Sequence, residues 1–116
     1  MHFTRSSDAQ PYQAAGHHSM AMHRIQGQDV TPLNQVWSAR LSMAPGGHVE
    51  AKASPAGKLY IMVEGQVTFR GGDTTVELHP GDSVFVLPNE MREFRESAGG
   101  NALLYLVMLE SYQTHI

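Results

Sequence analysis

The chain contains no cysteine, and this absence removes several kinds of chemistry at once. Without a thiol it cannot form disulfides, thiolate zinc sites or cysteine nucleophiles. Charged residues are also few, at 16%, against about 25% in ordinary soluble domains. The lysines and arginines are scattered and form no basic stripe. We therefore expect no nucleic-acid partner, because phosphate binding requires clustered cations.

Long hydrophobic runs are missing as well. No apolar stretch approaches the roughly 20 residues that a membrane helix needs. The N-terminal segment 1–8 lacks the apolar core of a signal peptide, so we expect no membrane partner and a cytoplasmic location. A chain of 116 residues has the size of one domain.

Short segments rich in Val, Leu, Tyr, Phe and Thr alternate with Gly and Pro, a pattern typical of an all-β barrel or sandwich. Residues 1–39 are predicted to form an N-terminal arm and the first strands of a single domain, whose barrel core spans 40–116. About ten strands are expected in all. The clearest lie at 19–25, 35–43, 48–53, 58–64, 66–70, 74–79, 83–87, 91–96 and 102–109, with turns that include 45–47, 54–57, 71–73 and 80–82.

Two of these strands, at 59–63 and 103–109, are apolar on both faces. A strand of a lone small barrel should instead alternate, with polar side chains outside. We therefore expect the N-terminal arm or a second subunit to cover the outer face. Because an exposed apolar sheet face promotes aggregation, the sequence predicts a homodimer.

Two turns carry a resemblance to a known family. Residues 58–67 read Lys-Leu-Tyr-Ile-Met-Val-Glu-Gly-Gln-Val, and residues 79–89 read His-Pro-Gly-Asp-Ser-Val-Phe-Val-Leu-Pro-Asn. A Glu-Gly turn followed by a Pro-Gly-Asp turn, each next to an apolar strand, resembles the cupin superfamily over about residues 40–109. The resemblance implies an all-β fold, the cupin-type double-stranded β-helix or jelly-roll barrel.

Cupins usually hold a metal ion with two histidines and a glutamate from the first motif and a third histidine from the second. Counting back from Gly65, the glutamate position falls on Lys58, and counting on from Gly81, the third histidine position falls on Arg92. The first two histidine positions fall on Ala51 and Ala53, or on Lys52 and Ser54 if the loop is one residue shorter. Metal ions need imidazole or carboxylate ligands, so the resemblance implies a cupin without its metal and without a cofactor.

The same mapping points Lys58 and Arg92 into the barrel, where the guanidinium fork suits a carboxylate. Tyr60 lies on the same strand face as Lys58, and Met62 would also line the cavity. His17 belongs to a histidine-rich segment that could reach the barrel mouth as a base or could remain an exposed arm. The predicted ligand-binding residues are Lys58, Tyr60, Met62, Arg92 and His17.

An inward cation needs an anion, because its desolvation is otherwise costly. The sequence offers Glu50, Glu90 and Glu93 as internal partners. We expect an internal carboxylate, Glu50 or Glu90, beside Lys58 and an external anion beside Arg92, since the guanidinium is the better carboxylate receptor.

Three functions remain open at this point, and whether the protein is an enzyme is open with them. The first is a metal-free module that binds a small organic ligand, possibly a carboxylate, with an unknown reaction or none. The second is a metal-dependent lyase, isomerase or dioxygenase with rearranged ligands, for which His48, Glu50 and His17 are the available set. The third is a structural or regulatory dimer with a filled barrel.

Overall fold

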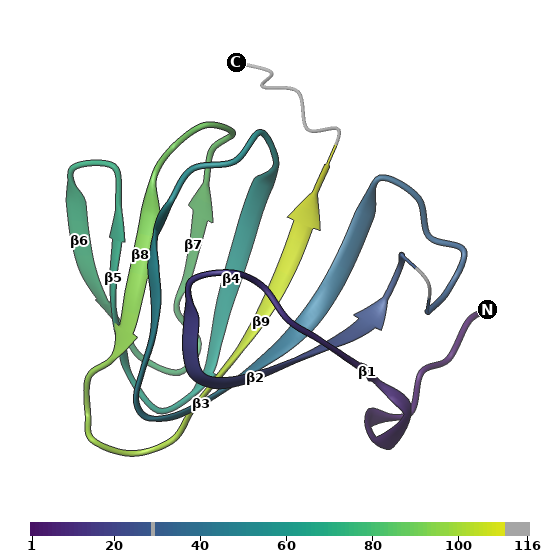
Figure 1. Cartoon of the computed structure of the whole chain (residues 1–116), viewed down its shortest axis with the longest axis horizontal. Helices are drawn as coiled ribbons and strands as arrows, with labels where there is room; N and C mark the ends of the chain where they lie inside the picture. Colours follow the sequence, from purple (N-terminus) through teal and green to yellow (C-terminus); the bar gives the residue numbers. More distant parts are fainter. Residues whose placement is uncertain (29, 111–116) are drawn as a thin grey trace.

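The computed structural model describes residues 1–28 and 30–110, and within them it contains nine strands and one short 3-10 helix. The strands curve into a nearly closed antiparallel barrel, so the predicted all-β jelly-roll is confirmed (Figure 1). The elements are η1 (Ser6–Asp8), β1 (Gln10–Tyr12), β2 (His17–Gln26), β3 (Val36–Lys52), β4 (Gly57–Glu64), β5 (Val67–Gly71), β6 (Thr74–Leu78), β7 (Ser83–Val86), β8 (Arg92–Glu96) and β9 (Ala102–Leu109).

The barrel is organised around β3, which is long enough to serve two neighbours. The strand order is β6-β5-β8-β3-β9-β4-β7. The first half of β3 pairs with β9, up to Met43 opposite Ala102, and its second half pairs with β8, where Lys52 lies opposite Arg92. β3 also pairs with β2, and β2 pairs with β1. His17 therefore lies in a strand of the sheet and not in an exposed arm.

One predicted turn was wrong. The segment 45–47 was expected to end a strand, yet β3 continues through it as one strand of 17 residues. Gly46 adopts a left-handed φ of +74°, and its backbone N–H donates to the Glu96 carboxylate at 2.9 Å. A Cβ on Gly47 would lie 2.6 Å from the carbonyl oxygen of Ser19, so only glycine allows β2 to stay alongside here. The two glycines therefore produce an irregular stretch inside the strand, and no reversal.

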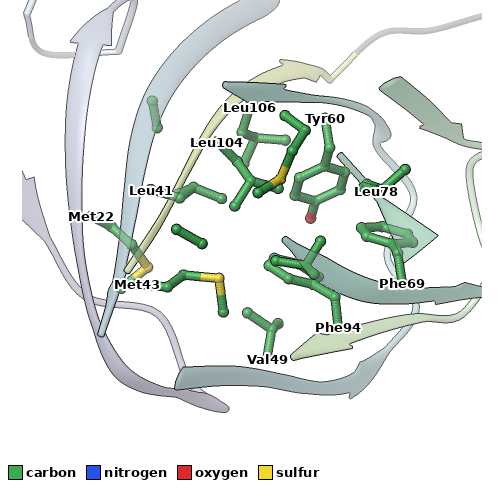
Figure 2. Close-up of a cluster of buried hydrophobic side chains, with 14 of the residues drawn as sticks. Met22, Leu41, Met43, Val49, Tyr60, Phe69, Leu78, Phe94, Leu104 and Leu106 are labelled. Atoms are coloured by element: carbon green, nitrogen blue, oxygen red, sulfur yellow. The ribbon is translucent and has the colours of Figure 1, made fainter. Parts of the chain in front are cut away.

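The core lies inside the barrel because successive strand residues face opposite sides. Every second residue of β3 from Trp37 to Met43 is buried. An aromatic cluster of Tyr60, Phe69 and Phe94 fills the interior, with ring centroids 5.1 to 5.2 Å apart (Figure 2). Side chains therefore fill the barrel interior over part of its length.

The outer face of β4 is apolar and accessible. Ile61 and Val63 are 37% and 40% exposed, while the arm formed by β1 and β2 packs along β3. The arm therefore does not cover these side chains, and the homodimer stays a prediction. Among the residues described, no helix is long and apolar enough to cross a membrane.

Candidate functional site

A pocket of about 260 Å³ opens at the end of the barrel where β4 and β8 begin and β3 and β9 end. The arm strands β1 and β2 supply its remaining wall. Four cationic side chains line it, whereas no Asp or Glu among residues 1–28 and 30–110 does so. The lining residues are Tyr12, Gln13, Ala14, Ala15, His17, Arg24, Trp37, Lys52, Ser54, Lys58, Tyr60, Arg92, Leu106 and Met108.

The pairing of β3 with β8 decides which residues face this pocket. The register shifts between Val49 and Lys52, so Lys52 faces the pocket directly opposite Arg92. Ala51 instead lines a separate outer groove. Of the two alignments that the cupin resemblance left open, the structure therefore supports the one that includes Lys52 and Ser54.

Arg92 is the best-anchored cation of the site. It is 6% exposed, and its Nε donates to the Tyr60 hydroxyl at 3.0 Å while its Nη1 donates to the Glu50 carbonyl oxygen at 2.9 Å. Burial raises the pKa of Tyr60, against the opposing influence of Arg92, so the phenol stays neutral. Both partners of the guanidinium are thus neutral groups, and its positive charge is not balanced by either.

Lys58 is more deeply buried, at 3% exposure, and its Nζ has no hydrogen-bond partner among the described residues. The pKa of Lys58 is lowered, chiefly by burial and then by the positive charges of Arg92 and Lys52. Desolvation and neighbouring cations both disfavour the ammonium form. The amine is therefore held closer to its neutral state than an exposed lysine would be.

The internal carboxylate expected beside Lys58 is not found in the described part of the chain. Glu50 hydrogen-bonds to His18 on the outside of the barrel, and its side chain is 60% exposed. Glu90 accepts a backbone N–H of the turn before β8, and Glu93 pairs with an arginine of β5. The prediction of an internal partner was wrong because these three carboxylates all have partners outside the pocket.

The arm completes the site with groups that the sequence reasoning missed. Arg24 lies over the rings of Tyr12 and Trp37, with its guanidinium carbon 4.4 and 4.7 Å from their centroids. Burial raises the pKa of Tyr12 to about 12, although Arg24 opposes this shift. No local sequence signal marked Arg24 or Tyr12, because only the pairing of β1 with β2 and of β2 with β3 brings them to the barrel end.

Four of the five predicted site residues line this pocket, and His17 is one of them. Its Nδ1 hydrogen-bonds to the Ala15 carbonyl at 3.0 Å, and burial lowers its pKa, so the imidazole is neutral at neutral pH. Met62 is the exception. It is 1% exposed and belongs to the hydrophobic core, because it lies further along β4 from the open end than Lys58 and Tyr60 do.

The side chains present do not fit a metal ion at the usual cupin position. Two amines, a hydroxyl and a guanidinium, from Lys52, Lys58, Ser54 and Arg92, occupy the four places. The alternative set of metal ligands is not brought together either. His48 and Glu50 line the outer groove, whereas His17 lines the pocket at the barrel end. In the described ranges, no three His, Cys, Asp or Glu residues form a group that could hold a metal ion.

Comparison with known proteins agrees with the architecture. A curated relative is a beta-D-galactosidase of Mycobacterium tuberculosis, 28% identical over 110 residues, which are 93% of each chain. A crystal structure of an RmlC-like cupin from Shewanella frigidimarina covers 97% of this chain and 94% of its own, with a TM-score of 0.80 at 14% identity. A predicted oxalate decarboxylase from Thermotoga maritima covers 94% and 99%, with a TM-score of 0.80 at 18% identity.

A polyketide cyclase from Streptomyces resistomycificus has the same fold, with a TM-score of 0.80 at 13% identity over 99% of this chain and 88% of its own. The family model described as a cupin domain matches residues 39–108, which run from the first half of β3 almost to the end of β9. The matched segment thus contains both motif turns and the two strands that carry Lys58 and Arg92. This chain belongs to the cupin family.

Proposed function

We propose that this protein binds a small organic anion in the pocket at the barrel end, without a metal ion, through Arg92 and Lys58. One observation carries the proposal: four cationic side chains line the pocket, and no carboxylate of the described chain faces them. Cations held together in a partly buried site repel one another and lose hydration. A bound carboxylate would relieve both costs.

Unused hydrogen-bonding capacity supports the same reading. The Lys58 Nζ, the Arg24 Nε and the Ser54 Oγ are all buried, and none has a hydrogen-bond partner among the described residues. Buried polar groups in proteins are nearly always paired, so three unpaired groups around one pocket indicate a missing partner. Carboxylate oxygens accept several hydrogen bonds at once and match this set.

The volume of the pocket and its apolar lining limit the kinds of ligand that it can hold. At about 260 Å³ the pocket is slightly smaller than typical ligand sites, which begin near 300 Å³. Trp37, Leu106 and Met108 add apolar surface to its lining. A short carbon chain or small ring that carries one or two carboxylates fits both features.

Calorimetric titration with acetate, pyruvate, lactate, oxalate and succinate tests the proposal. We expect at least one of them to bind in the millimolar range or tighter. Arg92→Met should weaken that binding more than about ten-fold, a loss near 1.4 kcal/mol. Arg95→Met is the matched control, because Arg95 lies on the same strand but is exposed on the outside.

The stability of Arg92→Met separates an external anion from an internal partner. Removing one member of a buried ion pair costs about 3–5 kcal/mol, because it strands the other charge. Arg92 pairs only with neutral groups in the described chain, so we expect a smaller loss. If no carboxylate binds at millimolar concentration and the variant loses several kcal/mol, the structural or regulatory reading replaces this one.

The names of the relatives suggest other chemistries, which the site supports less well. Most glycoside hydrolases use two carboxylates that flank the scissile bond. Among the described residues, the pocket lining contains no carboxylate, so this proposal does not extend the galactosidase activity to this chain. A metal-dependent reaction is tested by elemental analysis of untagged protein: we expect no stoichiometric metal, and about one transition-metal ion per chain would contradict the proposal.

A further inference from the structure

The buried amine of Lys58 has a chemical use beyond charge pairing. Lys58 lines the pocket at 3% exposure, and its Nζ has no hydrogen-bond partner in the described chain. The groups that face the pocket around it are the cations Lys52, Arg92 and Arg24 and the imidazole of His17, with no Asp or Glu among the described lining residues. The amine thus belongs to the wall of the pocket, with its nitrogen buried there, and no carboxylate of the described residues engages it.

A lysine reacts with carbonyl carbon only through its neutral form, because the ammonium group has no free electron pair. Burial and the neighbouring positive charges lower the pKa of Lys58. A lysine that is desolvated or placed beside another cation is the usual form of the lysine nucleophile in proteins. Each unit by which such a pKa falls gives about ten times more neutral amine at pH 7.

The Arg92 guanidinium can bind the carboxylate of a ligand and so place a neighbouring carbonyl group in front of the Lys58 amine. Its guanidinium is fixed by the Tyr60 hydroxyl and the Glu50 carbonyl, and it belongs to the same pocket as Lys58. Tyr60 is thereby a positioning residue, two places along β4 from Lys58. A ligand with a carboxylate next to a carbonyl group would meet the guanidinium and the amine together.

We propose that Lys58 forms a reversible imine with a 2-oxo acid whose carboxylate is held by Arg92. The Nζ electron pair attacks the carbonyl carbon, a C–N bond forms, and the carbonyl oxygen takes up a proton to give a carbinolamine. Loss of water then breaks the C–O bond and leaves a C=N bond, so amine and oxo acid give imine and water. His17, which is neutral because burial lowers its pKa, lies in the same pocket and can accept a proton in these steps. This inference rests on the proposed function, since it uses the same anion site.

Reductive trapping tests the inference, and the chain suits it because it contains only two lysines, Lys52 and Lys58. The full chain is incubated with pyruvate and sodium cyanoborohydride near pH 7 and analysed by intact mass and peptide mapping. We expect one adduct, equal to pyruvic acid less one oxygen atom, at Lys58. Lys52 is the internal reference, because it lines the same pocket but is exposed. Trapping at Lys58 should be at least about ten-fold faster than at Lys52.

Two variants and two comparison ligands, acetaldehyde and lactate, distinguish the possible outcomes. Lys58→Met should abolish the adduct, and Arg92→Met should reduce trapping of pyruvate to the slower rate seen with acetaldehyde, which has no carboxylate. Lactate carries the carboxylate of pyruvate but a hydroxyl in place of the carbonyl. If lactate and pyruvate bind but Lys58 is trapped no faster than Lys52, the imine is refuted and the anion site stands. If neither acid binds and no adduct forms, both proposals fail. If acetaldehyde is trapped at Lys58 as fast as pyruvate, the assignment to an oxo acid is overturned.

Discussion

Replacing Lys58 with methionine should make the protein more stable. Lys58 is 3% exposed, and its Nζ has no hydrogen-bond partner in the described chain. An unsatisfied buried donor costs about 1–3 kcal/mol, and methionine keeps an unbranched stem of similar length without that group. We therefore expect Lys58→Met to raise the free energy of unfolding at pH 7 by about 1–3 kcal/mol. In a chain of this size each kcal/mol corresponds to roughly 4 °C in melting temperature.

The gain in stability from Lys58→Met should depend on pH. The pKa of Lys58 is lowered in the folded protein, so the unfolded chain binds this proton more readily. Stability then rises with pH wherever the unfolded state carries more protons. The cost of burying Lys58 is full below its folded pKa and fades as the pH rises toward 10.5, the ordinary value for lysine. The advantage of Lys58→Met over the wild type should therefore shrink as the pH is raised.

Urea denaturation of both proteins from about pH 6 to about pH 10 measures this difference directly. Lys52→Met is the control, because it removes an exposed lysine from the same pocket and should change stability by less than about 0.5 kcal/mol. A Lys58→Met protein that is less stable than the wild type, or equally stabilised at every pH, would refute the conclusion that this amine is buried without a partner.

Three further predictions concern the stability of the barrel and its association into a dimer. Gly65→Ala should destabilise by at least about 1–3 kcal/mol in thermal or urea unfolding, because Gly65 has a φ of +81° and a Cβ there would lie 2.3 Å from the Asn101 carbonyl oxygen; an unchanged midpoint would contradict this. Glu96→Gln should lower the melting temperature at pH 7, because the Glu96 carboxylate accepts three backbone N–H groups, led by that of Gly46, which lower its pKa. A lowered carboxyl pKa contributes stability above 4.5, its ordinary value, that is lost as the pH falls through the folded pKa, so the two proteins should converge in acid. Light scattering should show a dimer that Ile61→Lys converts to a monomer, since Ile61 is 37% exposed on the apolar face of β4; a wild-type monomer near 12.8 kDa would exclude this.

The sequence determined the fold class and most of the strands, because these depend on local information. Val- and Leu-rich segments ended by glycine and proline gave β4 to β9 within a residue or two at each end. The prediction failed at 45–47, where the local turn signal was real but β3 continues close beside β2, with the Gly46 N–H donating to the Glu96 carboxylate, and does not reverse. Long-range contacts of this kind leave no trace in a short window of sequence.

The site was predicted only in part, for the same reason. The resemblance to the cupin motifs was enough to identify Lys58 and Arg92 as inward cations, since both fall on motif positions that face the barrel interior in that family. The choice between Ala51 and Lys52 depended on a register shift against β8, which only the folded sheet decides.

The arm residues Tyr12 and Arg24 reach the pocket through pairing between strands distant in sequence. That no carboxylate of residues 1–28 and 30–110 lies beside Lys58 is likewise a tertiary property, because Glu50 is near in sequence but faces outward. The sequence set the types of side chain at this end of the barrel. The tertiary structure decided which of them share one pocket and which of their charges remain unpaired.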